Sequence, residues 1–575
     1  MRIILTAILA LALFISNAQT QITPFEKSAG KETATYFEAI DWYKKMDGFS
    51  SAVSVKKMGA SDAGYPLHLV MVSADGKFDP NQWHKQGKVV ILINNGIHPG
   101  EPDGIDASMM LVRDIINKKI SLPNNVALAV IPVYNIGGSL NRNSYTRANQ
   151  NGPLEYGFRG NAQNLDLNRD FTKCDSKEAR SFTEIFHYLN PDILIDNHVS
   201  DGADFQHTMT LIATQYNKLG PTLGKWLRES FEPTLYNGMS LKGWDMVPYV
   251  NFETTDFDKG MQMFMDPPRY SSGYAALFNT LSFMPETHML KPYKERVQST
   301  YDLMEVFIQQ SGLASKEIKK MRAVATDEWM NLKQYPLKWI PDSSIFSEIN
   351  FKGYQTKYTL SEATGLNKMV YDHTAPYTKK IKFFYSFLPT NEIKKPTAYL
   401  IPQGWHAVIS LLKENKVKMS LLSKDTIIPV VAYKIKDYKS YPVAYEKHHK
   451  NYAVKLDIIN RDQRFLKGDV LVYLNQPANR YLIEMLEPTG DDSFFAWNYF
   501  DGILQQKEGY SDYRWEDIAA DILKKDSSLN EKLRVKKEGD SKFATNSGAI
   551  LDFIYKNSSY YEKAHLQYPV YRIDY

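Results

Sequence analysis

The sequence has 575 residues and a mass of 66.0 kDa, enough for more than one domain at roughly 100–200 residues per domain. Its 69 Lys and Arg residues nearly balance 65 Asp and Glu residues, so the formal charge of +4 argues against a nucleic-acid or anionic-membrane partner. Cys174 is the single cysteine, which excludes an intrachain disulfide and a cysteine-based zinc site. Any metal ion must therefore be held mainly by His and carboxylate side chains. We expect Cys174 to be a packing residue, because no activating partner is identifiable.

Residues 1–18 have the pattern of a signal peptide. Arg2 is followed by an apolar run over 3–15 that only Thr6 interrupts, and 16–18 are small residues suited to a cleavage site. The rival interpretation is a membrane anchor, but the run is shorter than the roughly 20 residues that span a bilayer. We therefore predict cleavage after Ala18 and an exported protein, periplasmic or secreted, with no membrane span after signal removal.

Residues 19–325 alternate between strand and helix patterns from about residue 85 onward. Apolar, β-branched runs predict buried strands at 88–94, 125–132, 192–196 and 281–285. Helices are expected from about Gly104 and from Asp175 to Leu189, where Asp175 and Glu178 form a predicted N-cap and capping box. This order predicts an α/β fold with a mostly parallel mixed sheet and helices on both faces.

The sequence changes character after a polar helical stretch over 293–327. Short strand-like runs separated by polar residues predict a β-rich accessory domain over 335–575, with strands at 399–402, 426–433, 452–457 and 469–473 and helices near 405–414 and 515–524. Aromatic clusters at 497–501 and 555–575 are interpreted as core and interface in preference to a peptide- or glycan-binding face.

Four polar residues stand at or just after the ends of predicted buried strands: His98, Glu101, His198 and Glu286. Ligands bind at the carboxyl ends of strands in open α/β sheets, so these side chains are expected to converge. A catalytic zinc site needs three His or carboxylate ligands and an open position for water. His98 and Glu101 form a local pair for such a site, and His198 is a natural third ligand.

Four segments occur in the order of a known family's signatures. They are His98-Pro-Gly-Glu101, Asn164-Leu-Asp166-Leu-Asn168-Arg169-Asp170-Phe171, Asp196-Asn197-His198 and Pro285-Glu286-Thr287. Over roughly residues 35–300 the sequence resembles the zinc carboxypeptidases, the M14 peptidase family of carboxypeptidase A. The departures are Asp170, where many members carry Asn, and a long Asn- and Gly-rich loop from 135 to 160.

The resemblance implies a role for each matching residue. His98, Glu101 and His198 would bind one Zn²⁺ per chain, the ligand set of carboxypeptidase A, with Mn or Co as possible occupants in vitro. Asp166 would hold the first histidine, Asn168 and Arg169 would grip the terminal carboxylate of the substrate, and Glu286 would be the general base.

For two further roles implied by the resemblance, the sequence offers two candidate residues each. The arginine that stabilises the oxyanion is expected to be Arg147, with Arg142 as the competitor, and the tyrosine that closes over the substrate is expected to be Tyr270, with Tyr274 as the competitor. In this family, the residues between that tyrosine and the general base determine which C-terminal side chain the pocket prefers. Residues 275–279 contain no acidic residue there, which disfavours a C-terminal Lys or Arg and allows an apolar or aromatic side chain. His207 and His288 match no motif position and are expected either behind the site residues, in contact with them, or at the surface.

The sequence thus predicts an exported zinc metallocarboxypeptidase that hydrolyses the C-terminal peptide bond of peptides or proteins, using zinc-activated water and a Glu general base. Related folds use the same metal set on other amides, so hydrolysis of peptidoglycan stem peptides or acyl-amino acids is the alternative within the enzyme class. A non-catalytic peptide-binding protein with this fold is the alternative from another class. No nucleic-acid partner is expected.

Overall fold

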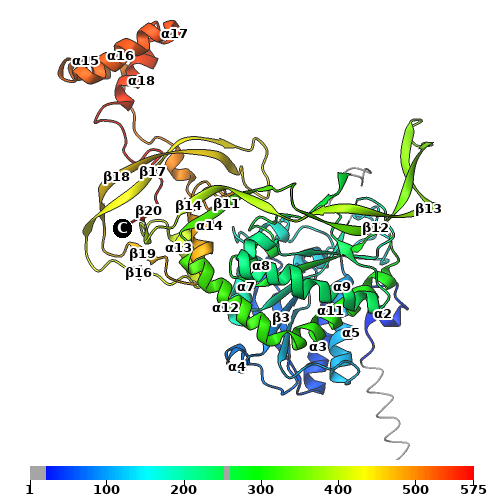
Figure 1. Ribbon diagram of the computed structural model, residues 1–575. Helices are drawn as coiled ribbons and strands as arrows, with labels where there is room; N and C mark the ends of the chain where they lie inside the picture. The colour runs from blue at the N-terminus through cyan, green and yellow to red at the C-terminus, as the bar shows by residue number, and fades with distance from the viewer. Residues whose placement is uncertain (1–20, 201, 251–258) are drawn as a thin grey trace, which may run out of the picture.

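The computed structural model describes residues 21–200, 202–250 and 259–575. The predicted signal peptide at 1–18 lies outside the described residues. Figure 1 shows an N-terminal region of helices around a sheet, a C-terminal region of long strands beside it, and a small group of helices that projects from the C-terminal region. We use "N-terminal region" for residues 21–331 and "C-terminal region" for residues 334–575.

A nine-stranded mixed sheet forms the centre of the N-terminal region. Its strand order is β1-β2-β4-β3-β5-β10-β7-β8, and β6 pairs with β10. Neighbours pair in parallel at β3–β4, β3–β5, β5–β10, β6–β10 and β7–β8, and antiparallel at β1–β2, β2–β4 and β7–β10. The strands are β1 (Val53–Ala60), β2 (Pro66–Val72), β3 (Val89–Asn94), β4 (Val126–Ile131), β5 (Ile193–Asp196), β6 (His198–Ser200), β7 (Met209–Ala213), β8 (Val247–Pro248) and β10 (Leu281–His288). The predicted mostly parallel mixed sheet is confirmed.

Helices cover both faces of this sheet. Every residue of β3, β4 and β5 is buried, which is the pattern of strands covered on both sides. The crossover through α5 (Asp103–Ile116) runs from β3 to β4, whereas the crossover through α7 (Lys177–Leu189) returns from β4 past β3 to β5. Right-handed crossovers in opposite directions place their helices on opposite faces, as the sequence predicts.

Two local expectations need correction. The N-cap of α7 is Ser176, whose side chain accepts a hydrogen bond from the backbone of Ala179, while Asp175 forms an ion pair with Lys173. The polar helical stretch is two helices, α11 (Tyr293–Leu313) and α12 (Ser315–Asn331). Ala314 is the C-cap of the first helix, and its backbone oxygen accepts a hydrogen bond from the backbone of Ile318 in the second.

The C-terminal region begins with paired strands that the sequence did not reveal. These are β11 (Gln334–Pro341) with β14 (Phe387–Lys394), and the long hairpin of β12 (Phe346–Leu360) and β13 (Asn367–Phe384). A six-stranded sheet follows, in the order β16-β19-β15-β20-β17-β18. It contains the predicted strands as β15 (Ala398–Ile401), β17 (Thr426–Ser440), β18 (Asn451–Phe465) and β19 (Val470–Tyr473), with β16 (Ser420–Leu421) and β20 (Tyr571–Ile573).

Helices make up much of the rest of the C-terminal region. The helices expected near 405–414 and 515–524 are α13 (His406–Glu414) and α15 (Asp512–Lys525). With α16 (Ser527–Gly539), α17 (Ser541–Ala544) and α18 (Ser547–Lys556), α15 surrounds a small hydrophobic cluster of its own, and this group projects outward (Figure 1). In the described part of the chain no helix is both long and apolar enough to cross a bilayer.

One hydrophobic core is shared by the two regions. It contains residues of the N-terminal sheet together with Tyr399 and Tyr481 of the C-terminal region. Tyr481 stacks on Phe278, with ring centroids 5.6 Å apart, and Arg480 donates to the backbone oxygen of Ala276 at 3.1 Å. The two regions therefore pack through buried residues as well as surface contacts. The domain boundaries at 325 and 335 stay a prediction.

Candidate active site

Three buried side chains converge at the carboxyl ends of the parallel strands. His98 and Glu101 lie in the turn between β3 and α5, and His198 begins β6 directly after β5. The His98 Nδ1 atom lies 3.2 Å from Glu101 Oε1, and the His198 Nδ1 atom lies 3.1 Å from Glu101 Oε2. One donor atom from each of the three residues lies within 4.8 Å of the others, and no second cluster of this kind occurs among the described residues.

A carboxylate holds the far nitrogen of each histidine. Asp166 Oδ1 lies 2.9 Å from His98 Nε2, and Asp196 Oδ2 lies 3.1 Å from His198 Nε2. Asp196 itself accepts hydrogen bonds from Ser271 Oγ at 2.6 Å and Asn94 Nδ2 at 3.0 Å. Both imidazole rings are thus oriented with Nδ1 toward Glu101. Sequence reasoning missed the role of Asp196, although it stands two residues before His198 at a strand end.

The charges in this cluster are strongly coupled. Burial alone would raise the pKa of Glu101, but His98 and Arg147 hold it well below its ordinary value. Burial alone would lower the pKa of His198, but the carboxylates of Asp196 and Glu101 hold it well above its ordinary value. The cluster therefore attracts positive charge, which protons or a metal cation can supply.

Glu286 lies beside this cluster on β10. The register of the sheet pairs Glu286 with His198 on β6 and with Thr210 on β7. Burial raises the pKa of Glu286 to about 8, while His198 opposes the shift and the Glu101 carboxylate adds to it. A cation held by the neighbouring ligands would favour the ionised carboxylate, the form that accepts a proton.

A second group of predicted residues lies across the same pocket. Asn168 and Arg169 belong to the short 3-10 helix Leu167–Arg169, for which Asp166 is the N-cap. The Arg169 guanidinium stacks over the Tyr270 ring at 4.2 Å from its centroid, and its Nη1 donates to the backbone oxygen of Asn168 at 2.9 Å. Asn168 Oδ1 accepts a hydrogen bond from the backbone of Ser271 at 3.3 Å. The structure thus brings Asn168, Arg169 and Tyr270 together.

The loop of residues 141–160 supplies further arginines. Arg147 Nη1 donates to Glu101 Oε1 at 2.7 Å and lines the pocket, whereas Arg142 donates to the backbone oxygen of Glu155 and does not line it. Arg159 was missed from the sequence. Its Nη2 lies 2.8 Å from Asp166 Oδ2 and its Nη1 lies 3.7 Å from Glu101 Oε1. Only the path of the long loop brings Arg159 here, since no motif marks it.

These groups surround one cavity of about 510 Å³. Its lining residues are His98, Glu101, Arg147, Arg159, Asn168, Arg169, His198, Val199, Ser200, Ile212, Tyr249, Phe264, Tyr270, Met284 and Glu286. The polar predicted residues thus share the cavity with apolar side chains, of which Ile212 and Met284 are buried.

One expectation about the pocket is wrong, and one alternative does not fit. Residues 275–279 do not line it; Ala275 and Ala276 are fully buried in α10 (Ser271–Ala276), and Phe278 packs on Tyr481. Tyr274, the competitor of Tyr270, is also buried in the core, where its hydroxyl donates to Asn415 Oδ1 at 2.7 Å. The apolar lining comes instead from Ile212 of β7, Met284 of β10 and Phe264.

Three residues set aside in the sequence lie outside the cavity. His288 Nε2 lies 3.2 Å from Asp204 Oδ1, and His207 Nε2 accepts a hydrogen bond from the backbone of Lys352 at 3.0 Å. Cys174 is buried, and burial raises the pKa of its thiol. A buried thiol of this kind is a poor nucleophile.

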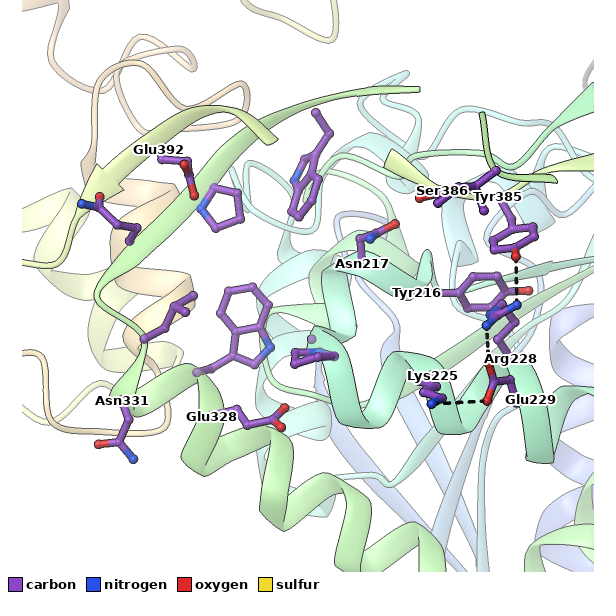
Figure 2. Close-up of a pocket in the computed structure, with 18 residues that line it drawn as sticks. Tyr216, Asn217, Lys225, Arg228, Glu229, Glu328, Asn331, Tyr385, Ser386 and Glu392 are labelled. Carbon is purple, nitrogen blue, oxygen red and sulfur yellow. Dashed lines mark hydrogen bonds and ion pairs between the residues drawn. The ribbon is translucent and has the colours of Figure 1, made fainter. Parts of the chain in front are cut away.

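A larger cavity of about 920 Å³ lies away from these residues (Figure 2). It is bordered by α8 (Gly220–Trp226), by α12, and by β11 and β14 of the C-terminal region. Figure 2 shows Tyr216, Arg228 and Tyr385 gathered together, where an Arg228 nitrogen donates to the Tyr385 hydroxyl at 3.0 Å. None of the sequence-predicted site residues lines this cavity, so we place the chemistry in the smaller one.

The comparisons with known proteins agree with this site. The family model described as zinc carboxypeptidase, peptidase M14, matches residues 40–192, a range that includes His98, Glu101 and Arg169 and ends before His198. Carboxypeptidase 2 of Trichophyton rubrum is 21% identical over 427 residues, covering 71% of this chain and 74% of that protein. Carboxypeptidase 2 of Trichophyton tonsurans is 20% identical over 430 residues, with the same coverage.

Solved structures of carboxypeptidases also match in part. A metallo-carboxypeptidase from Burkholderia cenocepacia is 15% identical, with a TM-score of 0.34, over 47% of this chain and 67% of that chain. Carboxypeptidase A from Helicoverpa armigera is 15% identical, with a TM-score of 0.37, over 50% of this chain and 75% of that chain.

An α/β sheet that carries a buried His, Glu and His cluster at its carboxyl edge is the arrangement of a metallopeptidase. Together with the family match and the relatives, it makes this chain similar to the zinc carboxypeptidases of the M14 family.

The residues present fit a zinc ion. Two imidazole nitrogens and one carboxylate form the donor set, all three side chains are buried, and each imidazole is already oriented by a carboxylate.

Proposed function

We propose that this chain is an exported zinc metallocarboxypeptidase that removes the C-terminal residue of peptides or proteins, with one zinc ion per chain. The observation that carries the proposal is that the His98, Glu101 and His198 cluster, the Glu286 carboxylate and the Arg169 guanidinium line one cavity. A zinc ion held by the cluster would polarise the scissile carbonyl and lower the pKa of a water molecule toward about 7.

The residues around the cavity have separate roles in binding the substrate. Arg169 and Asn168 bind the terminal carboxylate of the substrate, because a planar guanidinium matches a carboxylate in two parallel hydrogen bonds. The side chain of the C-terminal residue lies against Ile212, Met284 and Phe264, which favours apolar or aromatic residues. The Tyr270 ring packs against one face of the Arg169 guanidinium, and Tyr270 also borders the substrate.

Glu286 is the general base in this proposal. Its carboxylate takes a proton from the attacking water and later delivers that proton to the nitrogen of the leaving amino acid. Arg147 donates a hydrogen bond to the oxygen that becomes negative as the carbonyl is attacked. Its position near Glu101 supports this role, since it already lies at the ligand cluster.

Replacing Glu286 tests the proposal. Glu286→Gln keeps the shape of the side chain and removes its basicity, so we expect about one zinc per chain and a loss of peptide turnover of about 10²- to 10⁴-fold. Zinc content is measured by elemental analysis, and release of C-terminal residues from a mixed peptide pool is measured by mass spectrometry with and without a chelator. Glu295→Gln, at an exposed carboxylate of α11, is the matched control.

Each outcome has a distinct meaning. Full turnover by Glu286→Gln contradicts the assigned base. Zinc-loaded wild-type protein that trims no peptide contradicts the carboxypeptidase proposal and favours a stem-peptide or acyl-amino-acid substrate. Protein that binds no zinc supports a non-catalytic binding protein.

A further inference from the structure

A loop of the C-terminal region reaches the candidate active site. Residues 441–450 connect β17 to β18, and they contact the segment 166–175 of the N-terminal region. The Tyr445 hydroxyl oxygen accepts a hydrogen bond from Arg169 Nε at 3.0 Å, and Glu446 Oε2 accepts one from the backbone of Asp166 at 2.8 Å. These pairs are separated by 276 and 280 residues in the sequence. The contacts fall on the residue next to Asn168 and on the aspartate that orients His98.

The turn that carries these two side chains is strained. Tyr445 and His448 form an isolated antiparallel bridge, with backbone hydrogen bonds in both directions, so Glu446 and Lys447 are the two residues of a tight turn. Both have positive φ, 48° and 74°, where a turn of this kind prefers Asn and Gly. Residues in such backbone conformations persist only where surrounding contacts hold them. The hydrogen bond from Asp166 to Glu446 is such a contact.

The loop is also held by contacts that do not involve Arg169. The Tyr445 ring stacks on Trp497, at a centroid distance of 6.3 Å and an interplanar angle of 19°, and His448 Nε2 lies 2.7 Å from Asp175 Oδ2. Asp492 forms ion pairs with Lys450 at the end of the loop and with Arg269 of the N-terminal region. Tyr445 is thus held in place independently of Arg169.

Arg169 is constrained from three directions. Tyr445 accepts from Nε, the backbone oxygen of Asn168 accepts from Nη1, and Tyr270 supports the face of the guanidinium. With Nε occupied by Tyr445, the end of the guanidinium that carries Nη1 and Nη2 is the edge left for a planar carboxylate. A guanidinium without the Tyr445 contact would rotate about its last side-chain bonds and lose part of this orientation.

We propose that Tyr445 is a positioning residue for the carboxylate-binding arginine, and that the loop of residues 441–450 is a constituent of the substrate site. The C-terminal region then serves substrate recognition directly. This inference rests on the proposed function, in which Arg169 binds the terminal carboxylate.

Tyr445→Phe removes only the hydroxyl and keeps the ring on Trp497. Because a hydrogen bond to a charged group is lost, we expect the KM for peptides to rise about tenfold with kcat changed less than about threefold. The direct measurement is calorimetric binding to the zinc-loaded protein. Benzylsuccinate, a dicarboxylate, should bind about tenfold more weakly, whereas acetohydroxamate, a metal ligand without a carboxylate, should bind as in the wild type.

The loop offers a matched control. Tyr441→Phe removes the hydroxyl of an exposed tyrosine that stacks on Tyr452 and does not line the cavity, so both probes should bind as before. Unchanged benzylsuccinate binding by Tyr445→Phe, or equal weakening of both probes, overturns the inference.

A double-mutant cycle separates positioning from a general loss of structure. In an Arg169→Lys background the partner of Tyr445 is gone, so adding Tyr445→Phe should weaken benzylsuccinate binding less than twofold further. A full tenfold additional loss would mean that Tyr445 acts elsewhere, and it would overturn the inference. Because binding is read without turnover, a wild-type protein that binds both probes but trims no peptide contradicts the proposed function alone.

Discussion

The two regions of the molecule differ in how their strands are exposed. Every residue of β3 in the N-terminal region is buried, whereas β18 in the C-terminal region alternates between exposed and partly exposed residues along most of its 15 positions. A strand that is covered on both faces needs an unbroken run of apolar residues, whereas a strand with one solvent-exposed face does not. The N-terminal region therefore shows its architecture in the sequence, and it also supplies the metal ligands. The C-terminal region shows only short fragments of its long strands.

The two candidate arginines of the N-terminal region should differ strongly in their effect on turnover. Arg147→Ala should lower kcat for peptide hydrolysis by about 10²- to 10³-fold, because it removes the donor that we propose for the developing oxyanion beside Glu101. Arg142→Ala removes a hydrogen bond to a backbone oxygen outside the cavity and should leave kcat within about twofold. Steady-state kinetics of both variants test this. Equal losses of kcat in the two variants would mean that turnover depends on the loop as a whole and not on Arg147 alone.

A matched pair of core substitutions tests the contrast in burial. Ile93→Ala in β3 removes a side chain with 0% exposure and should cost about 2–5 kcal/mol of unfolding free energy. Ile458→Ala in β18 removes a side chain with 67% exposure and should cost less than about 0.5 kcal/mol. Urea denaturation followed by tryptophan fluorescence compares them. Similar losses at both positions would contradict the difference between the regions.

The smallest expected effect concerns a buried carboxyl beside the junction of the regions. Glu232 accepts a hydrogen bond from the Tyr216 hydroxyl at 2.6 Å, and burial raises its pKa from 4.5 to about 7. The folded state therefore favours the neutral form, and its stabilising contribution is lost as the pH rises from about 4.5 to about 7. The loss is of order 3 kcal/mol or less.

Glu232→Gln should remove this part of the pH dependence. Thermal midpoints measured between pH 4.5 and 7.5 should fall with pH less steeply in the variant than in the wild type. Glu229→Gln, at an exposed carboxyl in the same helical segment, is the control and should follow the wild-type slope. A Glu232→Gln slope equal to that of the wild type would contradict the assignment.

The motif residues of the site were visible in the sequence for a physical reason. His98, His198 and Glu286 each stand at or near the end of a buried strand, and the carboxyl ends of parallel strands meet at one edge. Arg159 was missed because a loop arginine carries no pattern of its own, and Asp196 stood in a signature segment without being given a role. Their partners are known only when the loop and the sheet are in place.

Errors in the sequence analysis have the same origin. Residues 275–279 lie between the predicted tyrosine and the base, but α10 directs them into the core, and Ile212 and Met284 line the cavity from neighbouring strands. Ser176 in place of Asp175 caps α7, because Asp175 is drawn to Lys173 and to His448 of the C-terminal region. A distant partner thus decides between two adjacent capping residues.

By itself, the sequence determined the mixed sheet with helices on both faces and the metal-ligating residue types, because apolar runs and local motifs encode burial and chemistry over short distances. Only the tertiary structure decided which arginines line the cavity, what forms its apolar wall, and that Tyr445 contacts Arg169 across 276 residues. Such contacts depend on how separately folded segments pack against each other, and no local pattern in the chain specifies them.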